Sequence, residues 1–145
     1  DIQAINHYWG IVFTVVAFGL PMSVFMFTNF IVSIPKALDE ASIIDGANIM
    51  QTFLLIILPQ LKPIIITIAI IHGVGAWNEY AYSLYLLQKP DLATITLTIK
   101  QYFSGVTNDY GGAAAAATLG IVPLIIVYVA LQDHFVRGQI DSAIK

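Results

Sequence analysis

The chain alternates long uncharged segments with short polar ones, a pattern that predicts helices crossing a lipid bilayer. No charged residue lies within residues 8–34, and a second uncharged run covers residues 110–132. Each run exceeds the ~20 apolar residues that a spanning helix needs. Tyr8 and Trp9 stand at one end of the first run, where interfacial aromatic residues are expected. These two runs therefore predict two membrane spans.

The apolar run between them is interrupted by Pro59, Lys62 and Pro63. A helix centred on Lys62 would bury its ammonium group in the bilayer, which is costly. Proline suits the first turn of a helix, so we expect this span to begin near Pro63 and to end near Leu86. The predicted fold is all-α and integral to the membrane, with spans at about 9–33, 63–86 and 110–132 and a polar coupling region at 35–61.

Composition supports this fold class and excludes several functions. Hydrophobic residues make up 58% of the chain and charged residues 10%, against about 25% charged in a soluble domain. The net charge is −3, and the basic residues are scattered rather than clustered as nucleic-acid binding requires. The sequence contains no cysteine and no H-x-x-x-H pair, so we expect no metal site.

The distribution of lysine and arginine predicts an orientation. Three spans place the coupling region on the same side as the C-terminus, and that side carries four basic residues against two on the other. By the positive-inside rule the coupling region faces the cytoplasm. The chain begins at Asp1 without a signal-peptide pattern, so we expect it to be the later part of a longer protein.

The coupling region contains the most informative motif. Ser33 is the expected N-cap and Pro35 the first turn of a short helix, whose apolar positions Leu38, Ala41 and Ile44 would share one face. Gly46 should end this helix, and an amphipathic stretch at 48–58 should lead back to the bilayer. Force applied to such a helix would reach two spans at once.

The motif reads E-A-S-I-I-D-G-A from Glu40 to Ala47, followed by F-x-x-I-x-x-P from Phe53 to Pro59. It resembles the signature by which permease subunits of binding-protein-dependent ABC importers dock their ATPases. Ser42 replaces the usual second alanine. W-N-E-Y from Trp77 and the C-terminal segment 132–145 are similar to the carbohydrate, maltose-type branch, although Ser142 stands where glycine is usual.

This resemblance covers nearly the whole chain and implies the C-terminal half of a six-helix permease in a bacterial-type cell membrane. It implies a second permease subunit, two ATPase subunits that bind ATP and magnesium, and an external solute-binding protein. No glycine here is followed by lysine, so the chain lacks a phosphate-binding loop and is not expected to be an enzyme. The ATPase-docking segment would comprise Glu40, Ala41, Ser42, Asp45, Gly46 and Ala47.

Two further groups are candidates for function. Trp77, Asn78 and Glu79 would lie near the outer end of the second span, where they could face a substrate pathway or simply meet water. The external loop predicts a short strand at 94–99, because T-I-T-L-T-I alternates, and then a turn. The resemblance implies that this loop contacts the binding protein, with Gln101, Tyr102, Phe103 and Asn108 as candidates.

Other polar and small residues favour structural roles. His72 is expected to be neutral and bonded to a neighbouring helix. Gly112, Ala116 and Gly120 repeat every four residues and favour close packing within the subunit over a special dimer face.

The predicted function is a permease subunit of a sugar or oligosaccharide importer. The alternatives are an importer of amino acids or peptides, a proton-translocating subunit, or a structural membrane subunit.

Overall fold

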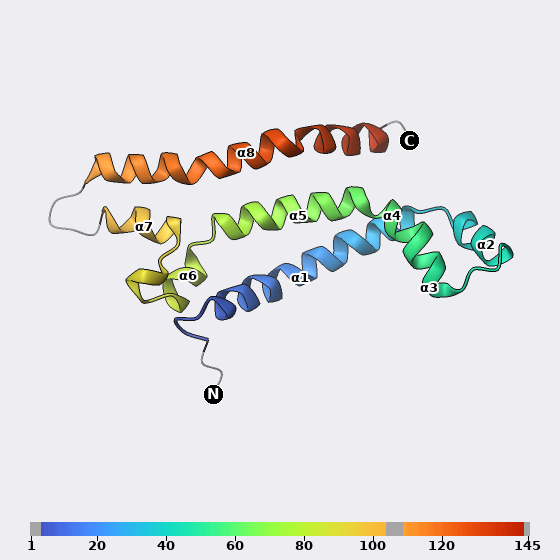
Figure 1. Ribbon diagram of the computed structural model, residues 1–145, viewed down its shortest axis with the longest axis horizontal. Helices are drawn as coiled ribbons and strands as arrows, with labels where there is room; N and C mark the ends of the chain where they lie inside the picture. The colour runs from blue at the N-terminus through green and yellow to red at the C-terminus, as the bar shows by residue number, and fades with distance from the viewer. Residues whose placement is uncertain (1–3, 104–108, 144–145) are drawn as a thin grey trace. The chain divides into compact units, whose positions relative to one another are not determined.

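The computed structural model describes residues 4–103 and 109–143, with side chains described up to Ala130. Within these residues every regular element is a helix (Figure 1), which confirms the all-helical fold class. Two helices are long and apolar enough to cross a bilayer: α1 (Tyr8–Ser33) over its whole length, and α8 (Tyr110–Ala143) over its part Tyr110–Ala130. Both continue through an internal proline, Pro21 in α1 and Pro123 in α8.

The third apolar run forms a broken helix. Its first part consists of α3 (Ile49–Thr52), the π-helix η1 (Phe53–Ile57) and α4 (Leu58–Gln60), and its second part is α5 (Lys62–Trp77). The two parts meet at a bend of 62° and count as a third candidate span if taken together. We had expected one helix from Pro63 to Leu86, but α5 ends at Trp77 and a separate helix, α6 (Ala81–Leu86), follows.

Pro59 explains why a π-helix lies in this segment. Proline has no N–H to donate to the carbonyl four residues earlier, and its ring crowds that carbonyl, here Leu55. The helix widens locally, so that the Leu58 N–H bonds the Phe53 carbonyl, five residues back. Such π-bulges are rare and often lie at functional sites.

The shorter helices are α2 (Ala37–Ile44), η2 (Pro90–Leu92) and α7 (Ile95–Gln101). The strand that we expected at 94–99 is therefore wrong. A lone strand would leave its backbone groups without a ladder partner, whereas a helix satisfies them internally. Thr94 caps α7 by accepting a bond from the Leu97 N–H, and the buried Leu97 anchors the helix.

The chain forms two compact units. The first comprises Asp1–Phe18 and Gly73–Asp133. Its core includes the small-residue face of α8, where Ala113 and Ala116 are buried. A Cβ atom added at Gly112 would overlap the Tyr102 ring, and one at Gly120 would lie 3.1 Å from Ile95. The stripe thus packs against α7 and the residue after it, which confirms the expected packing within the subunit.

The second unit comprises Gly19–His72 and His134–Lys145. In it the Ser23 Oγ lies 2.8 Å from His72 Nε2, joining α1 to α5. A Cβ atom at Gly19 would lie 2.8 Å from the His72 ring, so the missing side chain lets the imidazole approach the α1 backbone. The expected bond from His72 to a neighbouring helix is confirmed.

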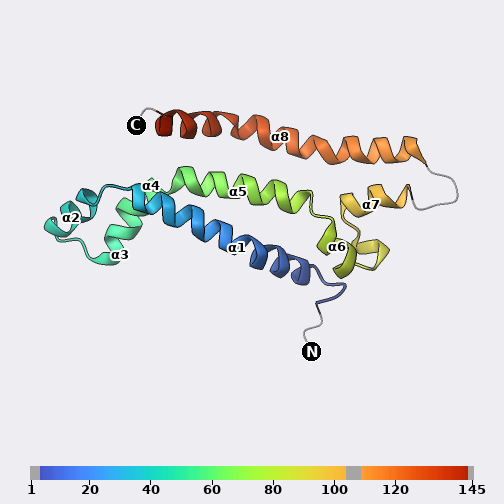
Figure 2. The same cartoon turned by 180° about the vertical axis from the view of Figure 1, so that it is seen from behind.

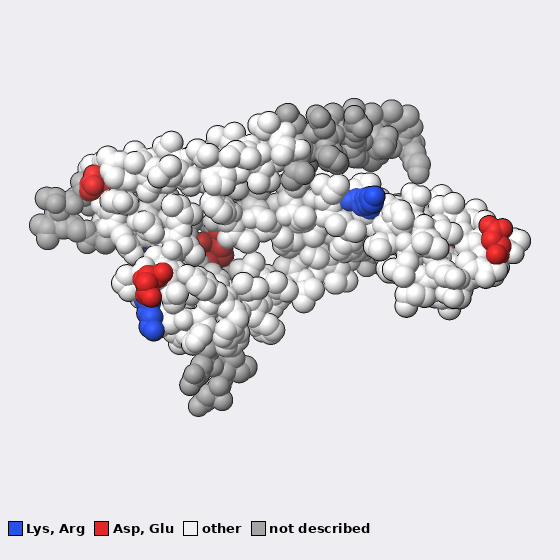
Figure 3. Space-filling view, in the orientation of Figure 1, with Lys and Arg blue, Asp and Glu red and all other residues white. Residues whose placement is uncertain are grey.

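Unit two also contains the turn between α2 and α3. Figures 1 and 2 show these helices lying next to each other on either side of a short connection beyond the end of α1. Charged side chains are few on the face seen in Figure 3, and acidic ones are visible on α2. Acidic side chains thus mark α2 on a face that is otherwise largely uncharged.

Candidate functional site

The end of α2 is built by a glycine-dependent cap. Gly46 has φ +83°, a left-handed conformation that L side chains rarely adopt. The Gly46 N–H bonds the Ile43 carbonyl and the Ala47 N–H bonds the Ser42 carbonyl. This is the Schellman pattern that satisfies the last carbonyls of a helix. The sequence prediction that Gly46 ends this helix is confirmed.

The start of α3 is fixed just as firmly. Asn48 Oδ1 accepts a 2.9 Å bond from the Gln51 N–H, and Gln51 Oε1 accepts one of the same length from the Asn48 N–H. This reciprocal pair is a capping box. Because the C-terminal end of α2 and the N-terminal end of α3 are both capped, the four residues between them form a defined turn rather than a loose loop.

The N-terminal end of α2 differs from expectation. Ser33 was the expected N-cap, but it is the last residue of α1 and donates a 2.7 Å bond back to the Phe30 carbonyl. Lys36 occupies the N-cap position without a side-chain bond. Because the Ser33 hydroxyl is bonded within α1, it does not cap α2.

The surface of α2 is both acidic and apolar. Glu40, Asp45 and Gly46 are exposed, as a docking segment requires. Within the apolar stripe expected from Leu38, Ala41 and Ile44, Ile44 is 85% exposed. Ile43 at 67%, Ile49 at 90% and Met50 are exposed beside it. Sequence reasoning missed these last three residues, although paired isoleucines next to a glycine turn are a usable signal.

Ser42 faces inward instead. It is 2% exposed and is the buried residue of α2. Its hydroxyl donates a 2.7 Å bond to the Asp39 carbonyl and lies 2.9 Å from Thr52 Oγ1. Of the six predicted docking residues, Ser42 therefore contacts this chain, whereas the acidic pair and Gly46 face outward.

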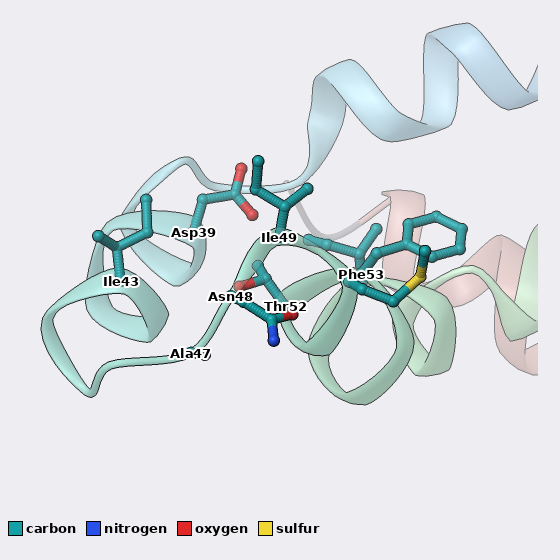
Figure 4. A pocket seen from close by; sticks show the side chains of 9 residues that line it. Asp39, Ile43, Ala47, Asn48, Ile49, Thr52 and Phe53 are labelled. Carbon is teal, nitrogen blue, oxygen red and sulfur yellow. The ribbon is translucent and has the colours of Figure 1, made fainter.

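A groove of about 810 Å³ runs between α2 and α3. In Figure 4 Asp39 and Ile43 come from α2, and Asn48, Ile49, Thr52 and Phe53 come from the following segment. Its lining is mostly apolar, with the Asp39 carboxylate at one side. The described part of the coupling region thus offers a concave apolar surface next to an acidic helix.

The second candidate group lies where α5 ends. Trp77 Nε1 donates a 3.0 Å bond to the Gly120 carbonyl, three residues before Pro123 in α8. Glu79 Oε2 accepts bonds from the N–H and the hydroxyl of Ser83, which is fully buried, and Glu79 Oε1 accepts one from the Tyr82 N–H. The carboxylate thereby caps the first turn of α6, where a negative charge is favourable.

The polar atoms of this second group are thus engaged within the chain. Asn78 Nδ2 donates a 3.0 Å bond to the Val74 carbonyl at the end of α5, and Thr96 Oγ1 donates one to the Glu79 carbonyl. The Trp77 side chain remains 40% exposed. The structure brings these three residues together at a helix break that sequence reasoning did not predict.

Replacing Trp77 by phenylalanine tests the link to α8. We expect Trp77→Phe to lower the free energy of unfolding by about 1 kcal/mol, because the ring is kept but the bond to the Gly120 carbonyl is lost. Thermal unfolding of the detergent-solubilised permease measures this loss. Tyr85→Phe is the control, because that ring is strongly exposed; equal stability of both variants would contradict the predicted role of the indole.

The external candidates are only partly described. Tyr102 is half-buried beneath Gly112, and Phe103 is exposed with its ring edge-to-face with Tyr110 at 5.9 Å. Gln101 is the last residue of α7. Asn108 lies outside the described residues, so its predicted contact has no structural counterpart here.

Comparison with known proteins identifies the class. Residues 2–141 match the family described as binding-protein-dependent transport system inner membrane component. The chain is 36% identical to the melibiose/raffinose/stachyose import permease protein MelC of Bacillus subtilis, over 100% of this chain and 53% of that protein. It is 37% identical to the multiple sugar-binding transport system permease protein MsmG of Streptococcus mutans, over 94% of this chain and 50% of that protein.

A third relative, the trehalose/maltose transport system permease protein MalG of Thermococcus litoralis, is 32% identical over 97% of this chain and 51% of that protein. No solved structure matches significantly. The chain belongs to the family of binding-protein-dependent transport system inner membrane components. It spans about half the length of the curated relatives it matches.

These comparisons confirm the main prediction from the coupling motif. The resemblance to a binding-protein-dependent permease is correct, and the family is one of transport components rather than enzymes. The family description and the apolar helices agree on a component of the inner membrane. The roles of individual residues remain predictions.

Proposed function

We propose that this chain is part of a permease subunit that imports a sugar or oligosaccharide and receives the energy of ATP hydrolysis through its coupling region. The observation that carries the proposal is the exposed acidic helix α2, ended by the left-handed Gly46 and attached to two candidate spans. ATP and magnesium are bound by two partner ATPase subunits. A second permease subunit and an external binding protein complete the transporter.

The docking surface combines charge with apolar area. Glu40 and Asp45 make polar contacts with the ATPase, and Ala41, Gly46 and Ala47 allow its backbone to approach closely. Ile43, Ile44 and Ile49 add the apolar area that their exposure of 67%, 85% and 90% leaves available. Burial of such side chains is worth about 1.5–3 kcal/mol each, so this apolar surface contributes strongly to affinity.

The orientation follows from charge. Lys36 and Lys62 flank the coupling region, and Arg137 and Lys145 lie near the C-terminus. The positive-inside bias therefore supports a cytoplasmic location for α2. The loop that carries Lys89 and Lys100 then lies outside, where Phe103 offers an exposed ring to the binding protein together with Gln101, Tyr102 and Asn108.

A sugar is the solute class that the relatives' names support, since MelC and MsmG are both named for sugars. Trp77, Asn78 and Glu79 are the proposed residues of the pathway. The exposed Trp77 ring suits the apolar face of a sugar, while Glu79, with both oxygens bonded, orients the helix break. The alternative solutes are amino acids and peptides.

The solute class is tested on the binding protein that acts with this permease. Its melting temperature is measured with a panel of oligosaccharides, amino acids and peptides. A rise with one or more saccharides alone is the expected result, because binding to the native state stabilises it. A rise with amino acids or peptides alone would contradict the sugar assignment and leave the docking proposal intact.

Substitutions at Glu79 distinguish the proposed permease from a proton-translocating subunit. If its role is to cap α6, Glu79→Ala should cost about 1–2 kcal/mol of stability and Glu79→Gln clearly less, because the amide oxygen can still accept a bond. Transport should fall in the same order. A proton carrier instead predicts that both variants abolish transport equally with ATPase association unchanged, a result that would overturn the capping role.

Deletion of Glu40–Ala47 tests docking directly. We expect the deleted permease to reach the membrane in normal amounts and to lose co-purification with the ATPase, because the whole exposed helix and its cap are removed. Deletion of Pro90–Leu92, a short external helix, is the control and should leave ATPase binding intact. Normal ATPase binding without Glu40–Ala47 would show that the docking assignment is wrong.

A further inference from the structure

The contact between Ser42 and Thr52 joins the docking helix to the broken span. Ser42 lies in α2 and Thr52 is the last residue of α3, directly before the π-helix η1. Their hydroxyl oxygens are 2.9 Å apart, and the residues are 2% and 9% exposed. This is a side-chain bond between the two helices, shielded from water.

The direction of this bond follows from the hydrogen count. A serine hydroxyl has one proton, and that of Ser42 is donated to the Asp39 carbonyl at 2.7 Å. Thr52 must therefore donate to the Ser42 oxygen. Among the described residues no buried side-chain nitrogen or oxygen lacks a partner. The pair is thus fully satisfied, and loss of either hydroxyl leaves the other without its partner.

The position of the pair determines how movement of α2 reaches α3 and η1. The connection between α2 and α3 is otherwise a short backbone turn capped by Gly46 and Asn48. Without the side-chain bond, only this capped backbone turn would hold the angle between α2 and α3, and the open groove beside α2 leaves room for that angle to change. With the bond, a displacement of α2 must carry α3 and η1 with it. Beyond these lie α4, the 62° bend and α5.

We propose that Ser42 and Thr52 form a hydroxyl latch, which fixes the docking helix to the broken span so that movement of the ATPase is transmitted to the membrane helices. This inference rests on the proposed function. It assigns Ser42 a positioning role within the chain rather than a contact with the ATPase. Ser42, which differs from the alanine usual in the signature, and Thr52 would then act as a pair.

The test measures solute transported per ATP hydrolysed by the complete reconstituted transporter. Ser42→Ala and Thr52→Val should each lower this ratio by about threefold or more, since each removes the bond between residues 42 and 52. Ser42→Ala also removes the bond to the Asp39 carbonyl. The exchanged pair Ser42→Thr with Thr52→Ser should restore most of the ratio. Loss of stability alone would reduce the amount of assembled transporter but not the ratio per assembled complex.

A cysteine pair makes the test independent of lost packing. The chain has no cysteine of its own, so Ser42→Cys with Thr52→Cys introduces a single possible disulfide. Oxidation should raise the transport-to-ATP ratio above that of the reduced form, because a covalent bond replaces the latch. Ser42→Cys alone, treated with the same oxidant, is the matched control and should not respond.

The outcomes separate the latch from the function on which it rests. If the unmodified chain binds no ATPase, both are wrong. If the ATPase binds but the single variants keep the normal ratio, the latch is wrong and the docking proposal stands. If the oxidised cysteine pair hydrolyses ATP without transport, α2 must move relative to α3, and the latch is likewise overturned.

Discussion

Gly46→Asp should abolish co-purification of the permease with its ATPase, lowering the bound amount at least about tenfold, which corresponds to 1.4 kcal/mol. Gly46 has φ +83°, and a non-glycine residue pays roughly 1–2 kcal/mol in that conformation. In the part of the chain that the structure describes, a Cβ atom there would meet nothing within 4 Å apart from its neighbours in sequence. The added carboxylate therefore projects outward, next to Asp45, into the space that the ATPase must approach.

Gly46→Asn is the matched control. Asparagine has nearly the same size, tolerates the left-handed conformation better than most residues and adds no charge. It should retain a large part of ATPase binding, while both variants should appear in the membrane in normal amounts. Unchanged binding by Gly46→Asp would mean that no partner lies against this turn, contrary to the docking assignment.

Gly19→Leu should strongly destabilise the packing of α1 against α5. A Cβ at position 19 would already lie 2.8 Å from the His72 ring, closer than real Cβ atoms pack. The imidazole cannot easily withdraw, because Nε2 is bonded to Ser23. Overpacking of this kind costs about 1–3 kcal/mol, and loss of the Ser23–His72 bond adds to it.

The measurement is thermal unfolding of the solubilised permease, and the control is a second substitution on the facing helix. Gly19→Leu combined with His72→Ala should recover part of the stability, because the new side chain then enters the space that the imidazole leaves. Stabilities that simply add would show that residues 19 and 72 do not touch. Gly73→Ala should cost little, since among the described residues no atom beyond its own stretch of helix lies within 4 Å of the added Cβ.

The general architecture could be predicted because the bilayer restricts the choices. Uncharged runs of more than 20 residues around Pro21 and Pro123 predict membrane spans. A helix is the structure that bonds the backbone groups of such a span within the segment itself. Gly46 was predictable for a similar reason, since few residues other than glycine suit the left-handed end of a helix. The family resemblance depended on the same region, where spacing and residue type agree at many positions.

The details of the site could not be predicted, because they depend on tertiary contacts. Alternation in T-I-T-L-T-I suggested a strand, but packing of Ile95 against Gly120 and the Thr94 cap produce a helix. Glu79 was expected to face a substrate pathway or water, whereas it caps α6 after an unexpected helix break. A pattern of single residues does not show which partner will satisfy a polar group.

Ser42 illustrates the same limit within the motif itself. Periodicity grouped Leu38, Ala41 and Ile44 in one apolar stripe of this helix, yet Ser42 is the residue that α2 buries. The face that turns inward is decided by the Gly46 cap and by where the capping box at Asn48 starts α3. Both caps are local features, but the direction in which they turn α2 relative to α3 depends on the three-dimensional structure.

The most direct test of the account is site-specific cross-linking in native membranes. Because the chain has no cysteine, a thiol introduced by Ala41→Cys on α2 is unique, and one introduced by Asp91→Cys in η2 serves as the control. A short thiol-reactive cross-linker should join the ATPase subunit to the permease from position 41 and not from position 91. Cross-linking to the ATPase from position 91, or from neither position, would contradict the claim that α2 is the element on which the ATPase acts.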